Sequence, residues 1–442
     1  MMADATSSPI GVNRPLPSEK ANRAWALVIL TTIAAFNTID RQLITILGAP
    51  IKAEFSLSDS QVGLIGLIYG VVFAIGAAPM AYIAARTSRR ATITGCLMLF
   101  SAGTALCGVA TSYIMVLVSR FAVAVGESGT AAPSQSLIAD FFPRASRTLA
   151  LSIFGAASKP GGFIAFLAGG WLAVWLGWRA TFLIMGLPGL AVAVLAWFYV
   201  REPSIGLSDR VEPAVAKTAV PVTFRECIAY LWRTPSFWHI LIGQGLWGLF
   251  TLGFVFWIPH YLSRSFGLSL GIIGTSMAFY ILGVGATGLI LLGWIAQKLQ
   301  IRDIRWMMWI LVLAALIATP CAWILLTTDS LWIAAFIAVP LMLLYGAAQG
   351  IPVSACQAIA PARMRTVTAA FLQIVIGFVS MGLGPFLPGI LSDLFAARFG
   401  EMSIRYSLLC FSLIWLWAAL HFFLASRTLI GDIERADIHN AA

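Results

Sequence analysis

The sequence predicts an all-α polytopic membrane protein in which twelve transmembrane helices form two pseudo-symmetric six-helix bundles. Of the 442 residues, 60% are hydrophobic and only 10% are charged, with a mean hydropathy of +0.90, values outside the range of soluble domains. Apolar runs of about 20 residues, the length that crosses a bilayer as a helix, recur along nearly the whole chain. One long polar interval divides these runs into two sets of six.

The first six runs predict an N-terminal bundle over residues 26–200. Residues 1–25 form a polar, proline-containing tail that we expect to be cytoplasmic. This tail lacks the apolar middle region of a cleavable signal peptide, so the first span is expected to stay in the protein. The six spans are expected at residues 26–47, 62–84, 91–111, 114–138, 148–174 and 180–200.

The polar interval, residues 201–236, contains four prolines and mixed charge, which is typical of a cytoplasmic linker. A surface helix is expected near Val222–Leu231. The C-terminal bundle follows over residues 237–425, and residues 426–442 are expected to be a cytoplasmic tail. The six spans of this bundle are expected at residues 237–262, 270–296, 306–327, 331–357, 367–391 and 406–425.

The basic residues predict how the chain is oriented in the membrane. Of 28 Lys and Arg residues, twenty lie in the tails, the linker and the other loops after even-numbered spans, and five lie in the opposite loops. Because basic loops stay in the cytoplasm, we expect both termini there. This distribution explains the net charge of +10 without a nucleic-acid partner. We expect a monomeric, multi-pass protein of the cell membrane, which in a Gram-negative cell is the inner membrane.

Missing motifs argue against an enzyme. The six cysteines have neither paired nor metal-ligand spacing, so we predict no disulfide, metal site or cofactor. No Gly-Lys-Ser/Thr phosphate loop is present, and ATP is therefore not expected to drive the protein. His239, His260 and His421 fall near predicted span ends, where we expect them at the membrane interface and not in a catalytic or proton-relay site.

Four charged residues interrupt the apolar runs of the first half: Asp40 and Arg41 in the first span, and Arg120 and Glu127 in the fourth. An ionisable side chain at membrane depth costs roughly 3 kcal/mol, so such groups usually pair or face a watery cavity. At about 1.5 Å per residue, Asp40 and Arg120 reach a similar depth from opposite sides and can pair. Glu127 lies about two turns deeper than Arg120 on the same helical face.

These positions suggest proton coupling. A buried carboxylate beside a guanidinium can gain and lose a proton as a cavity opens and closes, which makes Asp40 and Glu127 the candidate proton carriers. Arginine does not titrate usefully, so Arg41 and Arg120 are candidate charge-switch partners or anion binders. The alternative is a static ion-pair network that fixes helix packing. For Arg41, turned about 100° from Asp40 on its helix, a structural role is a close rival.

Lys159 is a fifth charge, about eleven residues into the fifth predicted span. It offers a fixed or titrating cation to an anionic headgroup. Alternatively, its side chain extends towards the membrane edge or meets Glu127. Pro160 and two glycines follow it and are expected to bend or loosen the helix.

The second half differs, because no charged residue falls deep in its six predicted spans. An aromatic stripe runs from Trp247 through Phe250 and Phe254 to Trp257 at helical spacing. Packing or lipid contact is the more common meaning of such a stripe, although one beside an amide also suits an acyl chain. The candidate residues of the substrate cavity are Asn37, Gln244, Trp247, Tyr280, Gln349 and Gln373.

A weak internal repeat relates the two halves. In Ala81–Arg90, after the second span, and in Gly293–Arg302, after the eighth, a small residue is followed by an Ala three residues on and then by basic residues. Repeated halves are typical of alternating-access transporters.

The first of these segments resembles the signature loop of the major facilitator superfamily, G-x-x-x-D-R-x-x-R-R. Arg86, Arg89 and Arg90 are retained, whereas Ala81 and Ala85 replace the Gly and the Asp. The resemblance implies the major facilitator fold, with this loop as a conformational element. In the superfamily the acid contributes to a cytoplasmic lock between the halves. Its replacement is therefore expected to favour inward-facing states.

Further segments resemble a bacterial member of the spinster group of lipid transporters over nearly the whole chain. The Asp-Arg pair of the first span is less specific, because organic-anion symporters of the same superfamily carry it too. The segments are Asn37–Gln42, Leu57–Leu64, Arg120 with Gly126–Gly129, Gly177–Arg179, Gly384–Pro385 and Leu391–Asp393.

The resemblance implies a proton-coupled secondary transporter that works by alternating access on an amphipathic lipid, such as a lysophospholipid or a sphingoid lipid. Its expected partners are this substrate, protons and membrane lipids. Two alternatives stay open: a proton-coupled symporter of a small organic anion, with Arg41 and Arg120 as the clamp, and a multidrug efflux carrier. A non-transporting sensor or scaffold would tolerate neutralisation of Asp40 or Glu127.

Overall fold

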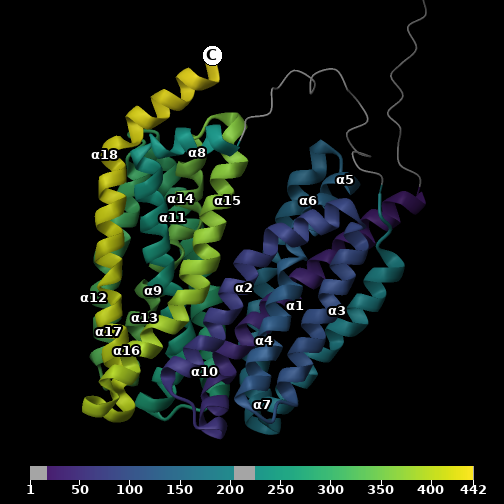
Figure 1. Ribbon diagram of the computed structural model, residues 1–442. Coiled ribbons are helices and arrows are strands. Elements are labelled where there is room, and N and C mark those ends of the chain that lie inside the picture. The colour runs from purple at the N-terminus through teal and green to yellow at the C-terminus, as the bar shows by residue number, and fades with distance from the viewer. Residues whose placement is uncertain (1–16, 204–223, 442) are drawn as a thin grey trace, which may run out of the picture.

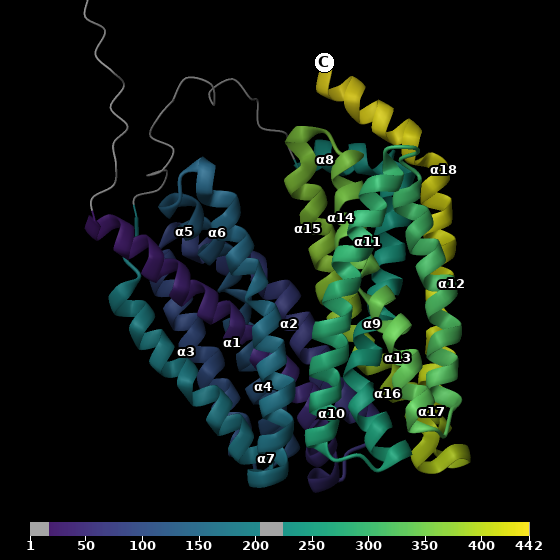
Figure 2. The same cartoon turned by 180° about the vertical axis from the view of Figure 1, so that it is seen from behind.

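The computed structural model describes residues 17–203 and 224–441, so most of the predicted N-terminal tail and the middle of the predicted linker lie outside the described residues. Two bundles of helices stand side by side, as Figure 1 and Figure 2 show from opposite directions. The bundles meet at one end and separate at the other. The end that carries α8 (Phe224–Trp232) and the last residues of the chain is termed the linker end, and the opposite end is termed the far end.

The N-terminal bundle consists of long apolar helices, three of which start at a serine cap. The Ser58 hydroxyl accepts a hydrogen bond from the Gln61 amide, and the Gln61 side chain accepts one from the Ser58 amide. Ser88 and Ser112 cap the next two helices, because each hydroxyl accepts a hydrogen bond from a backbone amide. The helices are α1 (Pro17–Phe55), α2 (Asp59–Arg86), α3 (Arg89–Gly108), α4 (Tyr113–Ser128), α5 (Ala131–Phe141), α6 (Arg144–Ala156) and α7 (Ser158–Tyr199).

Two boundaries in this bundle differ from the prediction. The span expected at residues 114–138 is divided between α4 and α5, because the backbone tightens to i−3 hydrogen bonds at Gly129 and Thr130. The span expected at 148–174 begins in α6 and continues in α7. The span expected at 180–200 lies in α7 as well, which comprises two helical stretches that meet at Gly177. The φ of this residue is 82°, a conformation that glycine adopts without steric cost.

The C-terminal bundle contains two π-helical segments, η2 (Ala278–Val284) and η4 (Ile376–Leu383), within helices that contact the N-terminal bundle. The surface helix expected near Val222–Leu231 is confirmed by α8. The other elements are α9 (Pro235–Phe266), α10 (Leu270–Met277), α11 (Gly285–Gln300), α12 (Trp306–Thr327), α13 (Leu331–Tyr345), α14 (Ala347–Ala358), η3 (Ala362–Met364), α15 (Arg365–Val375), α16 (Gly384–Phe399), η5 (Gly400–Met402), α17 (Ser403–Ser412) and α18 (Ile414–Ala441).

The last helix, α18, continues beyond the expected end of the final span at residue 425 and covers the segment predicted as a tail. Asp432 holds this extension against the start of α9. Its carboxylate accepts hydrogen bonds from the Ser236 amide at 2.9 Å and the Ser236 hydroxyl at 2.6 Å. The prediction missed this extension because it followed hydropathy alone.

The described residues contain ten helical stretches long and apolar enough to cross a membrane. Two of them, residues 146–199 and 367–440, have 54 and 74 residues, each long enough for two crossings. The ten stretches therefore fit an all-α protein with twelve crossings.

The bundles contact each other through glycines along two seams, one between α2 and the pair η4 and α16, and one between α7 and α10. A Cβ added to Gly70 would lie 2.3 Å from the Gly382 amide nitrogen. A Cβ on Gly274 would lie 2.2 Å from the Phe166 carbonyl oxygen. Side chains at these positions would force the bundles apart, so the glycines permit the close approach.

Candidate functional site

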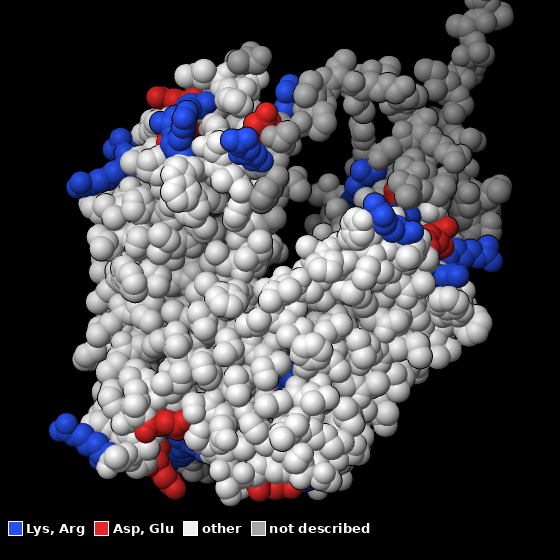
Figure 3. Space-filling view, viewed as in Figure 1, with Lys and Arg blue, Asp and Glu red and all other residues white. Residues whose placement is uncertain are grey.

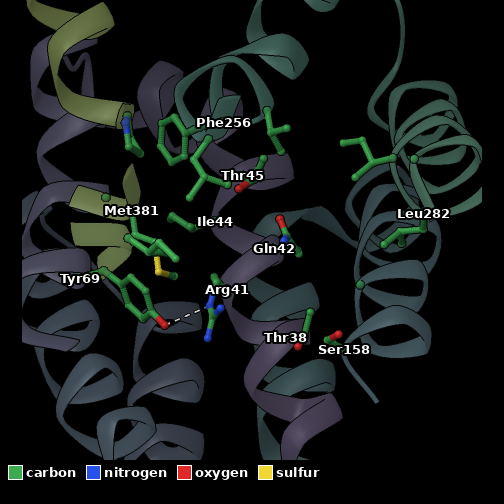
Figure 4. A pocket seen from close by; sticks show the side chains of 18 of the residues that line it. Thr38, Arg41, Gln42, Ile44, Thr45, Tyr69, Ser158, Phe256, Leu282 and Met381 are labelled. Atoms are coloured by element: carbon green, nitrogen blue, oxygen red, sulfur yellow. Dashed lines mark hydrogen bonds between the residues drawn. The ribbon is translucent and has the colours of Figure 1, made fainter. Parts of the chain in front are cut away.

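A cavity of about 300 Å³ lies between the two bundles and is lined by both. Figure 4 shows Thr38, Arg41 and Gln42 of α1 in this cavity, with Ser158 close to Thr38. In the space-filling view of Figure 3 the bundles are separated by an open gap towards the linker end. The C-terminal bundle contributes mostly apolar walls: Leu252, Val255, Phe256, Ile281, Leu282, Ile376, Met381 and Pro385.

The predicted pairing of Asp40 with Arg120 is confirmed. One guanidinium nitrogen of Arg120 lies 2.9 Å from each carboxylate oxygen of Asp40, and the Thr104 hydroxyl donates a further hydrogen bond to the same carboxylate. Asp40 is 3% exposed and Arg120 is 1% exposed. A buried pair of this kind leaves neither charge alone in the apolar interior.

Glu127 forms a second pair, with Arg41, and is fully buried. Its Oε2 accepts hydrogen bonds from the Tyr69 hydroxyl at 2.7 Å and the Arg41 guanidinium at 3.2 Å, while Arg41 also donates to the Tyr69 oxygen at 3.1 Å. Its other oxygen, Oε1, has no hydrogen-bond partner within residues 17–203 and 224–441. Arg41, with a side chain 34% exposed, connects this buried carboxylate to the cavity that it lines.

The two pairs form one group of side chains from α1, α2, α3 and α4, which we term the paired-charge site. Adjacent residues of a helix point about 100° apart, so Asp40 and Arg41 reach different partners. Asn37 lies one turn earlier on α1 and donates to the Thr130 hydroxyl at 2.7 Å. The members of the site are Asp40, Arg41, Tyr69, Thr104, Arg120 and Glu127. Sequence analysis missed Tyr69 and Thr104, because isolated hydroxyl groups in apolar spans are common.

Lys159 lies at the start of α7, where it lines the cavity and is half-buried. No ion pair of Lys159 occurs in the described part of the chain, so the contact with Glu127 that we considered is not formed. Arg41 and Arg120 are each paired with a carboxylate. Of the three cations Arg41, Arg120 and Lys159, it is therefore Lys159 that has no carboxylate partner in the described residues.

The remaining candidates for the substrate cavity fall in different places. Gln349 lines the cavity. Tyr280 faces a separate apolar pocket and donates to the Ala335 carbonyl at 2.9 Å. Gln244 and Trp247 are buried within the C-terminal bundle, and Gln373 is exposed.

The aromatic stripe of α9 is packed inside the C-terminal bundle. Trp247 lies against Trp415 and Phe422, with ring centroids 5.4 and 6.5 Å away, and Phe250 lies 4.4 Å from Trp415. Trp257 is fully buried and donates to the Pro385 carbonyl at 2.7 Å. The stripe therefore forms core packing.

The signature loop is held within the N-terminal bundle by Arg89. This buried guanidinium pairs with Asp140 and Glu202 and donates to the Pro203 carbonyl at 3.1 Å. Although burial alone would raise it, hydrogen bonds from the Ser88 hydroxyl and the Arg89 amide hold the pKa of Glu202 below its usual range.

The other two basic residues of this loop lie over aromatic rings of the same bundle. The guanidinium of Arg86 is 4.5 Å from the ring centroid of Tyr82, and that of Arg90 is 4.6 Å from Trp197. All three loop arginines thus have contacts inside the N-terminal bundle.

A second ionic group joins the two bundles at the far end. The Asp59 carboxylate accepts hydrogen bonds from Arg264 at 2.7 and 3.1 Å, from Lys52, and from the Ser392 hydroxyl at 2.6 Å. Asp393 accepts from the amides of Asp59 and Ser60 at 2.9 and 2.8 Å. This group, termed the Asp59 cluster, comprises Lys52, Asp59, Arg264, Ser392 and Asp393.

The prediction that the histidines lie at the interface is wrong for His260. It is 1% exposed, because the closed far end covers it. His239 and His421 are half-buried and face each other, with their Nδ1 atoms 3.1 Å apart.

Two helical halves around a central cavity, with paired charges buried in one half, define the class of secondary membrane transporters. The chain belongs to the Major Facilitator Superfamily, because the model of that family matches residues 30–385. It is similar to an MFS-type efflux pump of Mycolicibacterium smegmatis, with 30% identity over 93% of this chain and 94% of that protein. It is also similar to the sphingosine-1-phosphate transporter SPNS2 of Danio rerio, with 26% identity over 54% of this chain and 47% of that protein.

A solved structure confirms the spinster resemblance. The fold is similar to that of a bacterial homologue of the human lysosomal transporter Spinster in an inward-facing and unoccupied conformation, with a TM-score of 0.85 and 29% identity. The similarity covers 93% of this chain and 98% of that structure. The chain is thus a spinster-like transporter and not an enzyme.

Proposed function

We propose that the chain is a proton-coupled secondary transporter that works by alternating access on an amphipathic lipid with an anionic headgroup, such as a lysophospholipid or a phosphorylated sphingoid lipid. The observation that carries this proposal is Glu127, a fully buried carboxylate whose Oε1 is unpaired within the described chain and whose partner Arg41 lines the cavity. The protein acts as a monomer in the cell membrane, with both termini in the cytoplasm.

Proton coupling arises because Arg41 can pair either with Glu127 or with an anion in the cavity. While Glu127 is ionised, Arg41 and Tyr69 stabilise its charge through hydrogen bonds. A proton on Glu127 removes the negative charge, so Arg41 is released to attract an anion in the cavity. Proton binding and anion binding then favour each other, which couples the two fluxes.

The positive-inside rule supports an orientation in which the linker end faces the cytoplasm. The Asp59 cluster joins the bundles at the far end, and the gap opens towards the linker end. Under this orientation the structure is inward-facing. Alternation requires the Asp59 cluster to break when the outward-facing state forms.

The lining of the cavity supports an amphipathic anion. The N-terminal bundle contributes Arg41 and Lys159, whereas the C-terminal bundle contributes mainly aliphatic and aromatic side chains. With both carboxylates ionised, the five charged groups Asp40, Arg41, Arg120, Glu127 and Lys159 sum to +1, and this excess belongs to Lys159. A negatively charged headgroup at Lys159 places its tail against the apolar wall.

The size of the cavity favours a second candidate substrate, a small organic anion. About 300 Å³ lies at the lower limit of typical small-molecule sites and is small for a long acyl chain. Arg41 and Lys159 would then hold the anion directly.

The test is proton-gradient-driven flux of a labelled lysophospholipid in proteoliposomes. Glu127→Gln and Asp40→Asn should each abolish the gradient dependence. Asp329→Asn, which changes a carboxylate with a 90% exposed side chain at the far end, should leave the flux unchanged. Absence of lipid flux in the parent, with proton-driven uptake of a small organic anion, would replace the lipid by the anion.

Two separate lysine substitutions test the charge of the substrate. Lys159→Gln should raise the KM for an anionic lysophospholipid about tenfold or more, the effect expected when one charge-assisted hydrogen bond is lost. Lys298→Gln removes an exposed lysine that lies over the Trp294 ring and should have no effect. Recovery in Lys159→Arg would assign the effect to charge, and an unchanged KM in Lys159→Gln would contradict the role of this residue.

A further inference from the structure

His260 is a buried titratable side chain that the proposed proton pathway does not use. It lies near the far end of α9, and neither ring nitrogen makes a well-aligned hydrogen bond in the described residues, although the Gly48 backbone lies close enough to act on the ring. Leaving a buried polar group unsatisfied costs about 1–3 kcal/mol, so buried polar groups in folded proteins nearly always have partners. The ring is therefore poorly satisfied where it lies, and exposure to water would supply its missing hydrogen bonds.

The ring lies where the two bundles meet. A Cβ on Gly48 of α1 would approach the His260 Cε1 atom to 2.8 Å, so glycine provides the space for the imidazole. On its own helix the ring stacks on Phe256 and lies against Trp257, with centroid distances of 6.4 and 5.0 Å. Separation of α1 from α9 at the far end would therefore expose the ring to solvent.

The charges around the ring already balance without it. Lys52 of α1, Asp59 of α2 and Arg264 of α9 act on it electrostatically, and Asp393 of α16 binds the Asp59 amide. Two cations and two anions sum to zero. An imidazolium would add an uncompensated positive charge to this sealed site, where the Gly48 backbone acts on the ring but no carboxylate of the described residues pairs with it, and this is unfavourable. The closed far end thus requires a neutral ring.

We propose that His260 is a proton-binding site that opposes closure of the far end: the ring binds a proton when the bundles separate there and releases it before they close. This goes beyond the proposed function, because it requires only that the far end opens, whatever the substrate or driving ion. Each closure that starts from the protonated ring then returns one proton to the far side. Below about pH 6.5, the usual pKa of an exposed imidazole, the ratio of open to closed far ends rises about tenfold per unit fall in pH.

The experiment measures distances across the far end by pulsed electron paramagnetic resonance between pH 8 and pH 5. Spin labels are placed at Thr111→Cys and Ser269→Cys, exposed positions on opposite bundles, after replacement of the exposed Cys410 by Ser. A Glu127→Gln background removes any contribution from that carboxyl group. We expect the long-distance population to grow as the pH falls. His260→Gln should keep the distances of the closed state at pH 5.

Three further variants separate titration from packing. His260→Phe retains a ring of similar shape and should also abolish the pH response. Gly48→Ala, which forces α1 away from the ring, should increase the open population at every pH and retain the slope. His239→Gln changes a histidine outside the far end and should match the parent.

A pH response that persists in both His260 variants, or a parent without one, would overturn the proposal. The measurement needs neither substrate nor gradient. Its failure is therefore distinct from loss of lipid flux, which tests the proposed function.

Discussion

The two bundles differ in what they bury. The N-terminal bundle buries the paired-charge site, in which Asp40, Arg120 and Glu127 are at most 3% exposed. The C-terminal bundle buries aromatic rings, and Trp247 and Trp257 of its first long helix are at most 2% exposed. Buried charge is costly unless paired, whereas buried rings gain free energy from packing alone. The N-terminal bundle therefore buries charged groups that cost free energy and that packing does not require.

This difference indicates that the two bundles have different roles at the cavity. Groups that can change charge lie in one bundle, and the other presents an apolar wall to the same cavity. Both π-helical segments of the C-terminal bundle contribute to this wall, and both lie at seams with the N-terminal bundle. Short π-helical segments inside α-helices are frequent at functional sites. The C-terminal bundle thus combines a packed aromatic core with irregular helices where it contacts the N-terminal bundle.

The largest effect that tests this comparison is loss of stability in Arg120→Leu. Within the described residues, Asp40 would remain buried with the Thr104 hydroxyl as its one hydrogen-bond partner, and breaking a buried pair in this way costs about 3–5 kcal/mol. Thermal unfolding in detergent should show a large drop in the midpoint temperature. The double change Asp40→Leu with Arg120→Leu should regain most of the stability and still lack transport. If the double variant transported normally, the pair would serve packing only.

Most spans predicted from the sequence coincide with long helices of the structure, because bilayer thickness fixes the length of an apolar helix. Sequence analysis also predicted the pairing of Asp40 with Arg120, since two residues at the same depth on neighbouring spans have few other partners. The pairing of Arg41 with Glu127 was not predicted. Its formation depends on helix rotation and on Tyr69, neither of which depth alone determines.

The Asp59 cluster was beyond prediction for a different reason. Asp59 and Arg264 are 205 residues apart and belong to different bundles, so their contact depends on how the two bundles are arranged. His260 was placed at the interface because it lies near a span end. The closed far end buries that position, and no local pattern in the sequence encodes the closure.

A second, smaller effect is expected when an ion pair between the bundles is weakened, in contrast to the pair of Asp40 and Arg120 inside one bundle. Arg264→Gln removes two hydrogen bonds to Asp59 and leaves Lys52 as its remaining cation. We expect a shift of about 1–3 kcal/mol towards open far ends with little change in the unfolding midpoint. The distance between labels at Thr111→Cys and Ser269→Cys measures the opening. A large fall in the midpoint without opening would assign the cluster to folding.

The aromatic core gives a third prediction. Trp257→Phe removes the hydrogen bond to the Pro385 carbonyl and retains most of the buried ring. Stability should fall by about 1 kcal/mol, because one buried hydrogen bond is lost. The ratio of protons to substrate transported should stay unchanged, as measured by the reversal potential of the reconstituted protein. A changed ratio would show that coupling extends into the C-terminal bundle.

The smallest expected effect concerns the signature loop, in which Ala85 replaces the acid of the superfamily pattern. Ala85 is exposed and lies beside Arg89 and Glu202, both of which are held within the N-terminal bundle. Ala85→Asp adds a partly solvated charge, so we expect a shift of less than about 1 kcal/mol towards states closed at the linker end. Labels at Thr87→Cys and Gln297→Cys, exposed on opposite bundles, report this closure.

The neutral isostere Ala85→Asn is the control for this prediction, because it adds the same volume without the charge. Since the low pKa of Glu202 keeps that group ionised at pH 7, the new Asp meets a carboxylate as well as the loop arginines. The shift should therefore grow when Glu202→Gln is combined with Ala85→Asp. Identical distance distributions in the parent, Ala85→Asp and the combined variant would show that the lost acid does not set the resting conformation, which would then depend on the Asp59 cluster.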